Sequence, residues 1–495
     1  MGLPEEDTKN THSLKRVLKP FDLVMLGIGG IIGTGIFVLS GVAAGLYAGN
    51  ALPLSFIIAG TVCLFAALCY AEFSTMVPVA GSAYTYSYTA LGEIWAWIIG
   101  WTLILEYGLA ISAVAIGWSG YMTALVSTFG VHLPASLIHP FGIDGGIINL
   151  PSVLIVLCLT LLLIQGTRKS AGMNTIIVII KIAVILLFVL LSITSIHPVN
   201  WEPFMPPTGW LGVFSGAAIV FFAFIGFDAV VTAAEEIEDP QKSLPIGLIG
   251  SLGVSVVLYI IVGIVLTGVV PFALLAGADA INAPIAFALS SIGVSWGAAI
   301  VSVGALAGMT SVILVMLFGQ SRIFFAMSRD GLLPTFFSAV NPTTGTPTKS
   351  ILFIGLITAF VAGLFPLAMV AELVNMGTLV AFAIVALGVL ILRYRQPELC
   401  RPFKCPCVPY IPVLCIGTCI FLILYLKPIA HIMFIIWLCI GLVVYFLYGI
   451  RKSENRKHTP AEMPGPVHRS RHPESSLPDV MEIDMPPISV PEPER

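Results

Sequence analysis

The chain has 495 residues, of which 58% are hydrophobic and only 10% carry a charge, with a net charge of −3. Soluble domains carry about 25% charged residues, so this composition excludes a soluble globular protein and predicts an all-α polytopic membrane protein. Residues 1–20 are polar and of mixed charge, without the apolar region of a signal peptide, and we expect them to form a cytoplasmic lead-in.

Twelve apolar spans follow in chain order. They cover residues 21–47, 51–77, 92–127, 151–166, 172–195, 211–236, 246–270, 295–328, 350–366, 369–392, 409–426 and 428–449. Twelve crossings put both termini on one side of the membrane. The loops on the opposite side then carry only Lys427, whereas the segments on the side of the termini carry many Lys and Arg residues. Because positive charge concentrates in cytoplasmic loops, we expect a multi-pass protein of the cell membrane with both termini in the cytoplasm.

The first span contains the sequence GIGGIIGTGIF at residues 27–37. Gly is about 1 kcal/mol less favourable than Ala within a helix, so five glycines predict that this helix breaks near its centre. A break at membrane depth is tolerated where it lines a cavity or is buried in protein. Its free N–H and C=O groups suit an anion and a cation, the two charges of a zwitterion such as an amino acid. The alternative is that the glycines serve close helix packing.

The sixth span contains FFAFIGFDAV at residues 221–230 and predicts a second break. Asp228 is a carboxyl group at membrane depth, which indicates a functional site, although a hydrogen-bonded Asp that fixes helix packing is the alternative. The first and sixth spans each begin a set of five and cross in opposite directions. This plan predicts two inverted five-helix repeats, 21–195 and 211–392, with the spans at 409–449 as additions.

The rest of the chain indicates no other chemistry. Residues 451–495 are rich in Pro and charge, which predicts a disordered cytoplasmic tail. The cysteines at 400, 405 and 407 lack a fourth ligand, so we expect reduced thiols and no metal site. The glycine-rich stretch follows no strand and is therefore no dinucleotide-binding loop. The sequence thus predicts no enzyme, no cofactor and no nucleic-acid partner.

The stretches at 27–37 and 221–230, with AAEEIEDP at 233–240, resemble the amino acid–polyamine–organocation superfamily. Within it, the chain is most similar to the cationic amino acid transporter family and its bacterial permeases, over about residues 15–450. The resemblance implies a LeuT-type fold, a 5+5 inverted repeat with two extra helices, twelve transmembrane helices in all, with helices 1 and 6 broken. It also implies amino acid substrates.

The resemblance further implies where a substrate binds. The substrate carboxylate is expected at the main-chain amides of Gly33, Thr34 and Gly35, where the Thr34 hydroxyl can add a hydrogen bond. The ammonium is expected at main-chain carbonyls on both breaks, those of Ile31, Phe222, Ala223 and Ile225.

Lys181 is a lone ammonium in the middle of the fifth span. Burial disfavours the charged form of an amine, so Lys181 is expected to exchange a proton. In proton-coupled relatives a lysine of this span takes the place of a sodium ion, and Lys181 matches it in span and depth. We therefore expect Lys181 to couple transport to protons. A purely structural ammonium or a snorkelling lysine are the alternatives.

Two further residues are expected near the substrate side chain. Glu106 in the third span faces either the substrate or another helix. Met309 in the eighth span is expected to shorten the pocket, unless it is ordinary packing, and so favours small or medium neutral amino acids.

The sequence as a whole predicts a secondary active transporter in the lipid bilayer that takes up neutral L-amino acids with protons by alternating access. A cationic amino acid transporter, an obligate exchanger and a non-transporting amino acid sensor are the alternatives. The sequence leaves open whether a small membrane subunit binds the bundle.

Overall fold

The structure is a computed structural model that describes residues 18–76, 92–143, 145–165, 171–232, 234, 237–341 and 346–452. Most of the predicted lead-in (1–20), nearly all of the predicted tail (451–495) and part of the 233–240 motif lie outside these residues. The description below concerns the compact unit formed by residues 1–453.

The regular secondary structure of the described residues is helical, apart from one isolated bridge between Leu18 and Ile237. The longer elements are α1 (Pro20–Ile31), α3 (Leu52–Met76), α5 (Glu93–Ser127), α7 (Leu150–Ile164), α8 (Ala171–Ser192), α9 (Trp210–Val220), α11 (Pro240–Val269), α14 (Pro284–Ser291), α15 (Ser295–Arg329), α16 (Thr348–Leu364), α17 (Leu367–Arg395), α18 (Tyr410–Leu424) and α19 (Pro428–Val444). The shorter ones are η1 (Gly35–Leu39), α2 (Ser40–Ala43), η2 (Ala44–Ala48), η3 (Gly49–Ala51), α6 (Ala135–Ile138), η4 (Ile193–Ser195), η5 (Pro198–Trp201), η6 (Phe221–Phe224), α10 (Ala229–Thr232), α12 (Phe272–Leu275), α13 (Ala278–Ile281), η8 (Thr335–Phe337), η9 (Tyr445–Gly449) and α20 (Ile450–Lys452).

Helices fall within every predicted apolar span. Among the described residues, seven helical segments are by themselves long and apolar enough to cross a membrane, and five further apolar helices are shorter. In a bilayer every backbone polar group needs an internal partner, which helices supply. The chain is therefore a polytopic helical membrane protein, as its composition predicts.

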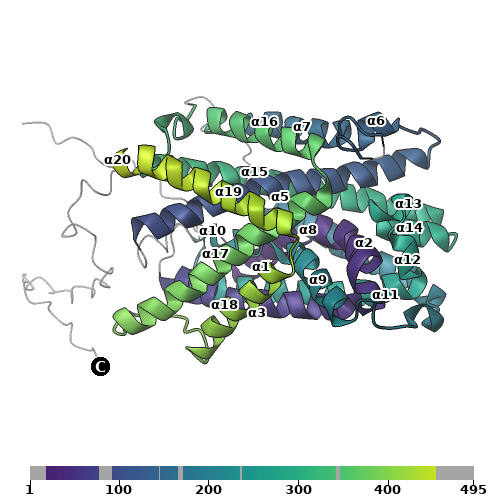
Figure 1. The fold of residues 1–495 in the computed structure, drawn as a ribbon, viewed down its shortest axis with the longest axis horizontal. Coiled ribbons are helices and arrows are strands. Elements are labelled where there is room, and N and C mark those ends of the chain that lie inside the picture. The colour runs from purple at the N-terminus through teal and green to yellow at the C-terminus, as the bar shows by residue number, and fades with distance from the viewer. Residues whose placement is uncertain are drawn as a thin grey trace, which may run out of the picture. The chain divides into compact units, whose positions relative to one another are not determined.

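The bundle encloses two interrupted helices. Figure 1 shows α7 and α16 side by side along its upper edge, and α3 and α18 along the lower side. The long helices α5 and α15 pack against each other through its centre. The first interrupted helix, α1 with η1, packs against α11 and α15, and the second, α9 with η6, packs against α3 and α17. Both interruptions are thus buried in protein.

The start of α7 has a clear local cause. The Asn149 side chain accepts a hydrogen bond from the backbone N–H of Ser152 at 3.3 Å and so caps the start of α7. Ser119 of α5 donates to the same Asn149 oxygen at 2.6 Å. The cap therefore also fastens α7 to α5.

Candidate functional site

The first interruption lies at Ile32 and Gly33, within the glycine-rich stretch. Helix α1 ends at Ile31, and Ile32 is extended with φ −75° and ψ 102°. The helix resumes as the π-helical turn η1 at Gly35. π-Helical turns are frequent at functional sites. The interruption frees carbonyls on the α1 side and N–H groups on the η1 side.

The second interruption lies between Phe224 and Ala229. The 3₁₀ turn η6 ends at Phe224, and Ile225 is extended with φ −64° and ψ 139°. Gly226 follows with φ +108°, a backbone conformation that glycine adopts without the steric cost of a Cβ atom. Helix α10 then begins at Ala229. A single glycine thus turns the chain where the first interruption uses several.

The two interruptions touch through their backbones. A Cβ atom on Gly30 would lie 2.8 Å from the Gly226 carbonyl oxygen, and one on Gly226 would lie 2.8 Å from the Gly30 oxygen. A Cβ atom on Gly35 would overlap Ala223. Glycine is therefore required here for close approach between two main chains.

A small cavity of about 10 Å³ lies between the interruptions. This volume holds about one water molecule and is far below that of ligand pockets in proteins, about 300–1,000 Å³. The cavity is lined by Gly30, Ile31, Gly33, Thr34, Gly35, Ala110, Val114, Phe222, Ile225, Val312 and Met316. Its lining side chains are apolar except for the Thr34 hydroxyl, so polar recognition there falls mainly to peptide groups.

Only some of the residues predicted to bind substrate line this cavity. Those that line it are Ile31, Gly33, Thr34, Gly35, Phe222 and Ile225, whereas Ala223, Glu106 and Met309 do not. Five lining residues were not predicted: Gly30 of α1, Ala110 and Val114 of α5, and Val312 and Met316 of α15.

Tyr259 of α11 joins the two interruptions and was not predicted from the sequence. Its buried hydroxyl lies 3.0 Å from the Ile31 carbonyl oxygen and 2.9 Å from that of Ala223. A hydroxyl has one proton, so it donates to one of these carbonyls at a time. Its ring packs against Phe56 and Phe224, with centroids 5.4 and 5.1 Å away. Tyr259 therefore contacts two of the main-chain carbonyls that are expected to bind the substrate ammonium.

Lys181 of α8 is fully buried, and its Nζ donates to the Gly29 carbonyl oxygen at 2.7 Å. In an unbroken helix that carbonyl would accept from the N–H of Gly33, which the interruption removes. The methylene groups of Lys181 lie against Gly308 of α15, where a Cβ atom would come within 3.1 Å of them. The ammonium thus lies at the first interruption rather than at a membrane surface.

Glu106 faces helices rather than the cavity. It is 1% exposed on α5, accepts a hydrogen bond from Thr378 of α17 and interacts electrostatically with Asp228. The Tyr107 hydroxyl donates to Asp228 Oδ2 at 3.2 Å. The Glu106 Oε1 atom has no hydrogen-bond partner among the described residues. Two carboxyl groups thus lie close together beside the second interruption.

Met309 acts on the cavity through Thr34. The Thr34 hydroxyl donates to the Met309 sulfur at 3.2 Å, and it also lies 3.4 Å from the Val114 carbonyl oxygen. Met309 is fully buried on α15. The thioether therefore helps to orient the one hydroxyl that lines the cavity.

Most of the chain is similar to known proteins. A family model described as amino acid permease matches residues 18–463. The chain is 52% identical over 450 residues to the branched-chain amino acid permease BcaP of Bacillus subtilis, covering 90% of this chain and 96% of that protein. It is 47% identical over 444 residues to the methylthioribose transporter of the same organism, covering 90% and 95%. It is 37% identical over 395 residues to the vacuolar cationic amino acid transporter 4 of Arabidopsis thaliana, covering 78% and 65%.

Proposed function

Because the chain belongs to the amino acid permease family, we propose that it takes up small or medium neutral L-amino acids together with protons. Uptake proceeds by alternating access on a LeuT-type fold of twelve spans, two inverted repeats and two added helices. The observation that carries the proposal is the cavity between two interrupted helices, where free peptide groups and apolar side chains meet. The relatives support the transport of amino acids directly. The choice of neutral substrates and the coupling to protons are the further steps of this proposal.

The main chain of the two interruptions binds the part that all α-amino acids share. The substrate carboxylate accepts from the amides of Gly33, Thr34 and Gly35, because N–H groups at the start of a helix carry partial positive charge. The ammonium donates to the carbonyls of Ile31, Phe222, Ala223 and Ile225. No fixed charge is needed at this site, so a zwitterion enters and leaves without breaking an ion pair.

The cavity wall selects neutral, apolar side chains. Ala110, Val114, Val312 and Met316 line the cavity, and in this proposal the substrate side chain extends against them. A basic side chain would bring a charge into this apolar lining without a partner, which is costly. Glu106 and Asp228 do not line the cavity, so they do not supply that partner. The name of the 52% identical relative, a branched-chain amino acid permease, agrees with an aliphatic substrate.

Lys181 couples transport to protons in this proposal. Its charged form makes a strong hydrogen bond to Gly29, two residues before Ile31. Loss of the proton weakens this bond and so changes the position of α1 at the site of the substrate ammonium. The proton and the amino acid thereby act on the same short segment.

Uptake into empty proteoliposomes tests the proposal. Labelled leucine or valine should accumulate when an inward proton gradient is imposed, and unlabelled neutral amino acids should compete better than arginine or lysine. Protein-free vesicles with the same gradient are the control.

The outcomes separate the alternatives. Uptake that needs amino acid inside the vesicles would show an obligate exchanger, and uptake indifferent to the gradient would remove proton coupling. Binding without any flux would favour a sensor.

A further inference from the structure

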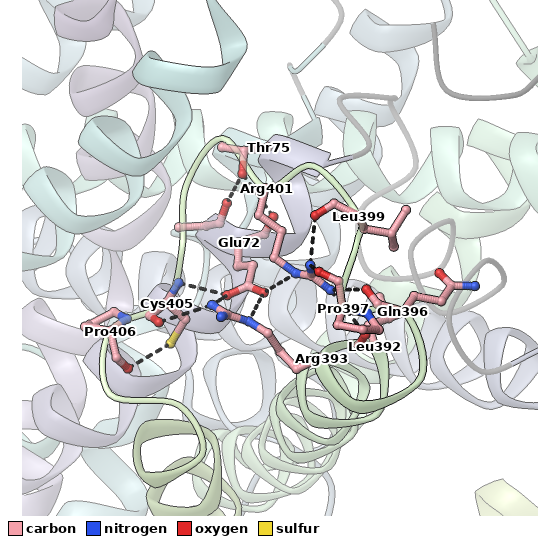
Figure 2. A network of polar contacts seen from close by, with 11 residues as sticks. Glu72, Thr75, Leu392, Arg393, Gln396, Pro397, Leu399, Arg401, Cys405 and Pro406 are labelled. Carbon is pink, nitrogen blue, oxygen red and sulfur yellow. Dashed lines mark hydrogen bonds and ion pairs between the residues drawn. The ribbon is translucent and has the colours of Figure 1, made fainter. Parts of the chain in front are cut away.

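A second polar centre lies away from the cavity, where α3 and α17 end (Figure 2). We call it the Glu72 cluster: Glu72, Arg393, Arg401 and Cys405. Glu72 is 2% exposed on α3. Its carboxylate accepts from Arg393 Nε and Nη2 at 2.9 and 2.8 Å and from the Cys405 backbone N–H at 2.8 Å, and Arg401 Nε lies 3.2 Å away. One buried carboxylate thus holds two guanidinium groups and a backbone amide.

Arg401 connects this carboxylate to the end of α17. Its Nη1 donates to the carbonyls of Pro397 and Leu399 at 3.0 and 2.8 Å, and its Nη2 donates to those of Leu392 and Gln396 at 3.1 and 2.8 Å. Figure 2 shows the chain after α17 folded around this guanidinium. The last carbonyls of a helix lack intrahelical partners, so Arg401 both caps α17 and pairs with Glu72.

The two helices joined here also hold the second interruption. On α17, Asn375 donates to the Ala218 carbonyl at 2.7 Å, just before the interruption. Phe382 packs on Phe221 and Phe227, with ring centroids 5.9 and 5.3 Å away. On α3, Tyr70 packs on Phe227 at 6.0 Å and on Phe382 at 5.5 Å. Tyr70 lies two residues before Glu72.

We propose that Glu72 is a positioning residue for transport: the Glu72 cluster fastens α17 to α3, so that both helices move together with the second interruption between them. The inference rests on the proposed amino acid transport. Compared with well-packed apolar side chains, a buried ion pair contributes little net stability. The bidentate contact with Arg393 instead fixes geometry, which is what a joint between two moving helices requires.

The test is Glu72→Gln in purified, reconstituted protein. The amide keeps the size of the side chain but loses the charge that holds both guanidinium groups. Turnover at saturating substrate should fall about tenfold or more, while the substrate dissociation constant stays within about threefold. Glu72→Asp, which keeps the charge, should recover part of the turnover. Lys242→Gln is the matched control, because it breaks an exposed ion pair of Lys242 with Asp239.

A folded Glu72→Gln protein with native turnover would overturn the inference, and so would equal losses of turnover and binding. If Glu72→Gln does not fold, Arg393→Lys decides by the same two measurements, since lysine keeps the charge but lacks the fork-shaped contact. If the unmodified protein transports no amino acid, the proposed function fails together with this inference. If the unmodified protein transports amino acids and Glu72→Gln does so at the same rate, only the role of Glu72 fails.

Discussion

Replacement of Gly35 by alanine tests the contact between the two interruptions most directly. The new methyl group would overlap the Cα and Cβ atoms of Ala223 and lie 3.0 Å from its backbone nitrogen. Overpacking of this kind costs typically about 1–3 kcal/mol. We expect the upper end, because main-chain atoms cannot rotate away as a flexible side chain does. The two interruptions must instead move apart.

Separation of the interruptions should also weaken substrate binding. A bound amino acid would reach amides on one interruption and carbonyls on the other, so it loses at least one charge-assisted hydrogen bond when they separate. Such a bond contributes about 1.5–3 kcal/mol, which corresponds to an affinity that is weaker by roughly 10- to 150-fold.

The assay compares thermal unfolding and equilibrium binding of a labelled neutral amino acid in purified protein. Gly417→Ala is the control, because no atom lies within 4 Å of its new Cβ in α18; alanine should there stabilise the helix by about 1 kcal/mol or leave it unchanged. Native stability and affinity in Gly35→Ala would refute the contact between the interruptions and the site built on it.

Three further substitutions act at and around the cavity. Lys181→Ala should sharply reduce flux driven by a proton gradient while part of the substrate binding persists, and an unchanged pH dependence of uptake would remove Lys181 from coupling. Met309→Ser should leave space behind Thr34 and free its hydroxyl, so that arginine and lysine compete better against a labelled neutral substrate; unchanged competition would show that Met309 does not limit the size of the side chain that binds. Tyr259→Phe keeps the ring but leaves two buried carbonyls without its hydroxyl, which should lower stability by about 1–3 kcal/mol; an unchanged unfolding temperature would argue against the hydrogen bonds to both interruptions.

The sequence indicated both interruptions, with unequal strength. At the first, five glycines within 27–37 weaken the helix locally, and the chain leaves the helix at Ile32 and Gly33. At the second, the signal is only Gly226 beside Asp228, yet the positive φ falls on that glycine. Local composition can predict a break because the cost of glycine in a helix is itself local.

The cavity wall was less predictable. Ala110, Val114, Val312 and Met316 lie on α5 and α15, two uniformly apolar helices. Which face of such a helix meets a ligand depends on how it packs against its neighbours, and the sequence of one helix contains no signal for that. The main-chain partners that the resemblance implies lie at the interruptions, and all of them except Ala223 line the cavity. Their contact with a substrate stays a prediction.

Two polar residues in apolar spans could have been found by the argument that singled out Lys181. Glu72 lies in the span 51–77, and a charged residue at that depth indicates function or a partner. Tyr259 lies in the span 246–270, and a buried tyrosine hydroxyl usually finds a hydrogen-bond partner. Their partners were beyond prediction, since the Ile31 and Ala223 carbonyls become available only after both helices break. Arg401 lies in a loop, where a basic residue by itself indicates only topology.

In the proposed mechanism, the strength of coupling between the Lys181 proton and the substrate is limited by the energy of a single contact. A ligand shifts an equilibrium only by its difference in affinity for the two states. For Lys181 that difference arises at one contact, the hydrogen bond from Nζ to the Gly29 carbonyl. A hydrogen bond from a charged donor contributes about 1.5–3 kcal/mol and a neutral one about 0.5–1.5, so protonation changes this contact by about 1–2 kcal/mol. Gly29 is followed by Gly30, which touches Gly226 of the second interruption, and by Ile31, which lines the cavity. The change therefore reaches both sides of the substrate site through three consecutive residues. In this scheme, the state of Lys181 alters substrate affinity by roughly five- to thirtyfold, and a much larger dependence would require a second proton site, for which Glu106 and Asp228 are the adjacent candidates.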